Sequence, residues 1–171
     1  FVITIQAGLV PKTKRWIDQL GGLVCQVKEI GVASPLLIDG ASGMVLDSGY
    51  ARQGSQLQPL FELTPPGLHT YFGNNDWPRE VDALSGRIWV ARTDIAKKYA
   101  DVSTGSVIFD KVVQDGLRVV FWPHVSLKYC GDLSIPESQS LRFSSRLRYS
   151  KGNIVLPRTT NLSVQRSDEN G

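Results

Sequence analysis

The chain has 171 residues, of which 42% are hydrophobic and 20% are charged, with a formal net charge of +3. This composition excludes wholesale disorder and a coiled coil. The two cysteines, Cys25 and Cys130, are too few for a disulfide-dense scaffold. No apolar run reaches the roughly 18–20 residues of a membrane-spanning helix, so we expect no membrane span. We predict one domain over 1–164, followed by a flexible polar tail over 165–171.

The predicted elements are mostly short strands, separated by turn signals. In chain order, strands are expected at 1–6, 23–30, 35–38, 44–46, 57–63, 87–91, 106–113, 117–122, 125–130, 141–149, 154–156 and 162–164. Short helices are expected at 12–20, where Gly21 and Gly22 end the segment, at 79–84 and at 95–99. The Asp115-Gly116 pair between two apolar runs predicts a hairpin.

The order of these elements predicts the fold class. Strands dominate and do not alternate with long helices, which disfavours a parallel βαβ arrangement. We therefore predict a mainly β protein built as an antiparallel β-sandwich. The particular kind of sandwich that we consider is a jelly roll. Up to three short helices lie in the connections.

The common catalytic motifs are absent, so we predict a protein without enzymatic activity, cofactor or bound metal. The two histidines and two cysteines show no zinc-ligand spacing, and phosphate-binding loops are missing. Cys25 is predicted to lie in the core and Cys130 to be exposed, and their pairing is left open. The segment 45–49 resembles the Asp-Ser/Thr-Gly loop of aspartic proteases. Because Asp and Gly are common in turns, we interpret this segment, and the similar one at 37–42, as turns.

A basic face is the strongest asymmetry of charge. Between 141 and 149 the residues alternate, so one strand face is apolar and the other carries arginines. The predicted contacts with nucleic acid or an acidic partner are Arg142, Arg146, Arg148 and Lys151, joined by Lys12, Lys14 and Arg15. The alternative is an ordinary solvated strand face that blocks edge pairing.

An aromatic and amide-rich loop suggests a second surface. We predict an interface or glycan-binding role for Tyr71, Phe72, Asn74, Asn75, Asp76 and Trp77. The alternative is that the aromatic side chains of this loop fold back onto the core.

The chain resembles a small viral coat protein or coat-protein domain in four features. These are the predicted β-sandwich, the lack of catalytic motifs, the basic face and a first residue, Phe1, that is not methionine. The missing methionine suggests a processed product or an excerpt of a longer chain. The resemblance implies a structural protein of the virion that self-assembles as a homo-oligomer or with other subunits and contacts nucleic acid by non-specific electrostatics. The alternative function is a carbohydrate- or receptor-binding module of a larger surface or fibre protein.

Overall fold

The structure is a computed structural model that describes residues 1–70, 73–99, 105–131, 148–150 and 153–155. The chain is mainly β, as predicted. Its helices are α1 (Trp16–Gln26), α2 (Thr93–Lys98) and α3 (Gly105–Gln114). The predicted strand at 162–164 and the predicted tail at 165–171 lie outside the described residues.

One seven-stranded sheet organises the described part of the chain. It contains β1 (Val2–Ile5), β2 (Leu9–Pro11), β3 (Ile30–Asp39), β4 (Val45–Asp47), β9 (Arg79–Glu80), β10 (Ile88–Ala91) and β11 (Arg118–Tyr129). Three two-stranded sheets are formed by β5 (Tyr50–Gln53) with β6 (Gln56–Pro59), β7 (His69–Thr70) with β8 (Gly73–Asn74), and β12 (Arg148–Ser150) with β13 (Asn153–Val155).

The main sheet is mixed, because its two longest strands run parallel. The order is β1-β10-β3-β11-β2, and the β3–β11 pair is parallel whereas its other pairings are antiparallel. Every residue of β3 except Asp39 is buried, as expected of a strand covered on both faces. The expectation of a wholly antiparallel sheet therefore does not hold at its centre.

The sheet curls until its two edges nearly meet. Strands β1 and β2 lie at opposite ends of the strand order, yet only Gln6, Ala7 and Gly8 connect them. Four extended residue steps span at most about 14 Å, so the edges lie close together. The linker is held at both ends, because Gln6 N donates to Arg87 O at 2.7 Å and Cys130 N donates to Gly8 O at 2.8 Å.

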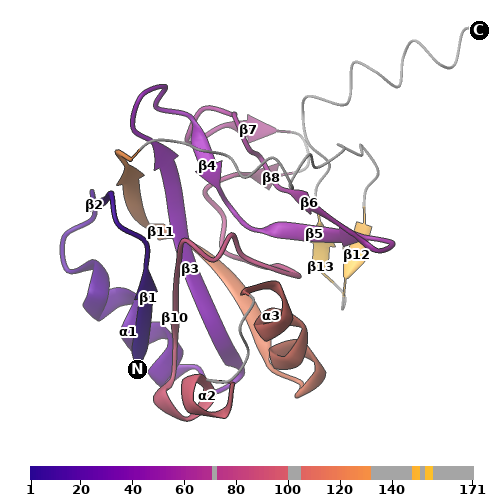
Figure 1. The fold of residues 1–171 in the computed structure, drawn as a ribbon. Helices are drawn as coiled ribbons and strands as arrows, with labels where there is room; N and C mark the ends of the chain where they lie inside the picture. Colours follow the sequence, from indigo (N-terminus) through magenta and orange to yellow (C-terminus); the bar gives the residue numbers. More distant parts are fainter. Residues whose placement is uncertain (71–72, 100–104, 132–147, 151–152, 156–171) are drawn as a thin grey trace, which may run out of the picture.

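Two hydrophobic clusters form on the curled sheet. One cluster includes Leu20 and Val24 of α1, and the other includes Ile95 of α2 and Phe109 of α3. Figure 1 shows α1 on one side of the β3–β11 pair and α3 on the other. The sheet is thus covered by α1 on one face and by α2, α3 and the β5–β6 region on the other.

The predicted strand at 23–30 is wrong over its first half, because α1 continues through the two glycines to Gln26. The buried side chains Leu20 and Val24 are four residues apart and share one helical face. Packing of that face on the sheet outweighs the helix-stopping tendency of Gly21 and Gly22. Cys25 consequently lies on an exposed turn of helix and not in the core.

The predicted strand at 106–113 is also wrong, since α3 occupies this segment. Ile108, Phe109 and Val112 are buried at helical spacing, although the β-branched composition favoured a strand. The Asp115-Gly116 pair does make a turn, but it ends the helix. Gly116 has a φ of 78°, Gly116 N donates to Val113 O, and Leu117 N donates to Val112 O.

Of five further predicted elements or pairings, three are confirmed, one is wrong and one is matched only in part. The hairpin of 35–38 with 44–46 is confirmed as β3–β4, the strand at 87–91 as β10, and the helix at 95–99 as α2. The helix at 79–84 is wrong: residues 79–80 form β9, which pairs with β11. Strand β6 covers only part of 57–63.

Candidate functional site

The predicted basic strand face lies almost entirely outside the described residues. Arg142, Arg146 and Lys151 are outside them, and Arg148 is described only by the backbone of β12, which pairs with Val155 of β13. In the aromatic loop, Tyr71 and Phe72 lie outside the described residues, and Asn74 is described only as a residue of β8.

The rest of the aromatic loop separates into a buried amide and an exposed indole. Asn75 is fully buried; its Oδ1 accepts from Gly67 N at 2.8 Å, and its Nδ2 donates to Thr64 Oγ1 at 3.1 Å and Pro65 O at 2.6 Å. The amide therefore holds the neighbouring loop. Asp76 is half-buried, whereas Trp77 is 57% exposed, so Trp77 is the side chain here most open to a partner.

Arg79 anchors this loop to the core. Its guanidinium carbon lies 4.8 Å from the centroid of the Phe61 ring and 5.0 Å from that of Phe121, and its Nε donates to Trp77 O at 3.1 Å. Burial lowers the pKa of Arg79 to about 10, and the nearby Asp76 carboxylate opposes this shift.

Lys12, Lys14 and Arg15, hereafter the basic loop, are exposed between β2 and α1. The loop is fixed to β11, because Lys12 N and Thr13 N both donate to Ser126 O, and Ser126 N donates to Thr13 Oγ1 at 2.9 Å. Arg15 adopts a left-handed φ of 55° and pairs with Asp18 at 3.0 Å. No described residue forms an ion pair with Lys12 or Lys14.

A slip in strand register opens a groove next to this loop. Trp122 of β11 pairs with Pro35 of β3, but the next pair is Ser126 with Leu36, so three extra residues bulge from β11. An odd number of extra residues reverses which face of a strand its side chains point to. Pro123 lies inside the bulge, where its missing N–H removes no ladder bond.

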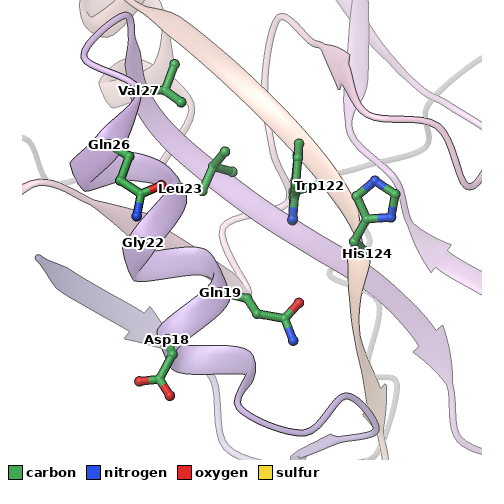
Figure 2. A pocket seen from close by; sticks show the side chains of 8 residues that line it. All are labelled: Asp18, Gln19, Gly22, Leu23, Gln26, Val27, Trp122 and His124. Atoms are coloured by element: carbon green, nitrogen blue, oxygen red, sulfur yellow. The ribbon is translucent and has the colours of Figure 1, made fainter.

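The bulge and α1 enclose what we call the α1–β11 groove. Its volume is about 440 Å³, and it is lined by Asp18, Gln19, Gly22, Leu23, Gln26, Val27, Trp122 and His124. Figure 2 shows the indole of Trp122 and the ring of His124 side by side, with the Gln19 amide extending toward them. The two rings meet edge to face, with centroids 4.9 Å apart and an interplanar angle of 75°. The groove thus combines an aromatic wall with amide hydrogen-bonding groups.

The groove and the basic loop are physically joined. Gln19 Nε2 donates to Lys14 O at 3.0 Å, and Arg15 is paired with Asp18. In Figure 2 the Asp18 carboxylate points away from Trp122. The basic loop therefore borders the Asp18–Gln19 end of the groove.

Gly22 contributes open space to the groove. A β-carbon added at Gly22 would meet no atom of the described residues within 4 Å outside its own helix backbone and chain neighbours, so no packing contact within the described part of the chain requires a glycine there. A glycine inside a helix costs about 1 kcal/mol relative to alanine. The residue widens the groove at the expense of helix stability.

The two aspartates of the protease-like segments have separate structural roles. Asp47 is 3% exposed; its Oδ1 accepts from Gly49 N at 2.9 Å and its Oδ2 from Ser85 N at 3.3 Å. Burial raises the pKa of Asp47, and the hydrogen bonds oppose that rise. Asp39 is half-buried and accepts hydrogen bonds from Ser42, which lower the pKa of its carboxyl. Each aspartate stabilises a turn, as the turn interpretation implies.

Cys25 and Cys130 are both exposed and unpaired. Among the described residues, no three His, Cys, Asp or Glu side chains gather where they could hold a metal ion. Within the same residues, no helix is long and apolar enough to cross a membrane. Comparison of the chain with family models, curated proteins and solved structures found no match.

Sequence reasoning missed the groove. Trp122-Pro123-His124 did signal an interrupted strand, but a slip in pairing with a distant strand has no local signature. The segment 16–26 had to be recognised as one helix before Gln19, Gly22 and Gln26 could be placed on one side of it.

Proposed function

We propose that this chain is a non-enzymatic structural protein of the viral coat type, which assembles with copies of itself in a virion and contacts nucleic acid electrostatically. The observation that carries the proposal is the basic loop. The ammonium groups of Lys12 and Lys14 are exposed and form no ion pair with a described residue, and backbone hydrogen bonds hold the loop in place. Such uncompensated charge suits contact with phosphates.

Self-assembly is supported by exposed apolar side chains on the edge strands. Val2 and Ile5 of β1 and Val10 of β2 are 37%, 47% and 51% exposed. Edge strands with exposed apolar residues favour association with another chain. The jelly-roll arrangement is part of the proposal and is separate from the observed topology, in which the described strands form one mixed sheet and three two-stranded sheets.

Salt titration tests the nucleic-acid part of the proposal. The purified chain should bind a single-stranded oligonucleotide with an affinity that falls steeply as salt rises, and should form oligomers by sedimentation. Replacing both Lys12 and Lys14 by Ala should reduce the slope of log K against log salt by about 0.7 for each phosphate that is no longer neutralised. The matched control replaces Lys97 and Lys111, two exposed lysines on α2 and α3. A monomer that binds no nucleic acid at low salt would rule the proposal out.

The second candidate is a carbohydrate- or receptor-binding module, and the exposure of Trp77 favours it. Aromatic faces beside carboxylates suit sugar binding. This candidate predicts binding on a glycan array that is insensitive to salt and is abolished in Trp77→Ala. Binding that persists in this variant would count against it.

A further inference from the structure

We propose that the α1–β11 groove binds one unpaired base of single-stranded nucleic acid, while the basic loop contacts the phosphates beside that base. The inference rests on the proposed function, because it assumes that the chain binds nucleic acid. It adds a defined site and a preference for single strands, which charge alone does not provide.

The aromatic wall supplies the stacking surface. Single-strand-binding proteins stack bases on aromatic side chains beside a positively charged path for the backbone. Trp122 is half-buried, packs against the core cluster and meets His124 edge to face, so its indole is held in place mainly by packing. A preset aromatic ring loses little side-chain entropy when a base stacks on it.

The helix wall supplies the polar groups. Gln19 and Gln26 lie on the α1 side of the groove, opposite β11. Side-chain amides both donate and accept, so they can hydrogen-bond the edge of any base. The open space over Gly22 leaves room for the ring between the two walls.

The charges favour a nucleotide over a neutral sugar. The groove contains one carboxylate, Asp18, which is paired with Arg15 and points away from Trp122. Lys12 and Lys14 remain without an ion-pair partner among the described residues at that end of the groove. A sugar site would gain nothing from two adjacent ammonium groups, whereas the phosphates flanking a bound base would pair with them.

The test compares two 12-nucleotide probes that carry the same phosphates: oligodeoxythymidine and a fully abasic strand. The chain should bind the thymidine strand about tenfold more tightly than the abasic strand, a ratio within the range for one stacked base. Gly22→Leu should fill the groove and abolish this preference, with affinity for the abasic strand unchanged. The matched control is Cys25→Leu, which places the same side chain on an exposed turn of α1 outside the groove lining and should retain the preference.

The outcomes separate the inference from the proposed function. If the chain binds both strands equally, or if folded Gly22→Leu keeps the preference, the groove does not hold a base, although the electrostatic contact stands. If neither strand binds at low salt, both proposals fail. Circular dichroism checks folding, and Trp122→Ala, which removes the stacking ring, replaces Gly22→Leu if that variant does not fold. Photocrosslinking of a strand containing 5-iododeoxyuridine should map to Trp122 or His124.

Discussion

The ring of Phe1 lies directly against Gly21, so that a β-carbon at Gly21 would overlap the ring. The contact joins the residue before β1 to the middle of α1, and a β-carbon at Gly21 would displace the Phe1 ring. The next residue, Gly22, has no such neighbour. A side chain at Gly21 would therefore collide with the Phe1 ring, whereas a side chain at Gly22 would extend into the α1–β11 groove.

Alanine substitutions at the two glycines should have different effects. Gly22→Ala should raise the free energy of unfolding by about 0.5–1 kcal/mol, because alanine favours the helix and meets no neighbour. Gly21→Ala should give no such gain, since it displaces Phe1. Urea unfolding measures both variants. In a Phe1→Ala background, Gly21→Ala should recover the gain, and equal effects at the two positions in the wild-type background would contradict the Phe1 contact.

Asn75 should contribute strongly to stability. Asn75→Ala removes a fully buried amide that makes three hydrogen bonds to the loop at 64–67. Leaving such groups without partners costs about 1–3 kcal/mol, so we expect unfolding to become easier by ~2 kcal/mol. Trp77→Ala in the same loop is the control. Its side chain is 57% exposed, and its removal should change stability by no more than about 0.5 kcal/mol. Equal destabilisation in the two variants would show that the loop is not held through Asn75.

Local patterns predicted those elements whose apolar spacing fits only one structure. The β3–β4 hairpin and β10 were found in this way. The segments 23–30 and 106–113 were misassigned because runs rich in Val and Ile suit a strand and a buried helix equally. Packing against the sheet decides between them, and the sequence alone does not contain that contact.

The candidate site was predicted in part. Lys12, Lys14 and Arg15 were identified from their clustering, and the structure places them exposed at one end of the groove. Trp122 and His124 were not identified, because their position depends on the slip between β11 and β3. Parallel pairing of strands about 90 residues apart cannot be derived from local periodicity.

Asp47 should make stability depend on pH in the opposite direction from Asp39. Burial raises the pKa of Asp47 above 3.8, so its stabilising effect is fully present below that pH and disappears as the pH rises through the folded-state pKa. The destabilisation caused by Asp47→Ala should therefore shrink from pH 4 toward pH 8. Urea unfolding across this range measures it, and a penalty that grows with pH would contradict a raised pKa.

Asp39→Ala is the matched control for that experiment. Hydrogen bonds from Ser42 lower the pKa of Asp39 below 3.8, so its stabilising effect is present above that pH and disappears as the pH falls through the lowered value. The cost of Asp39→Ala should thus be constant from pH 8 to about pH 5 and decrease only in more acidic solution. Opposite trends in the two variants would tie the pH dependence to the two carboxyls.

Both thiols should react in the native protein. Cys25 is exposed on α1 and Cys130 is exposed just after β11, and the two are not paired. A colourimetric thiol reagent should therefore label two thiols per chain without denaturant, and Cys25→Ser and Cys130→Ser should each leave one. Labelling of Cys25 that required denaturant would indicate a core position and would contradict the helical assignment of 23–26. The reaction thus tests directly the segment where the sequence pattern was misinterpreted.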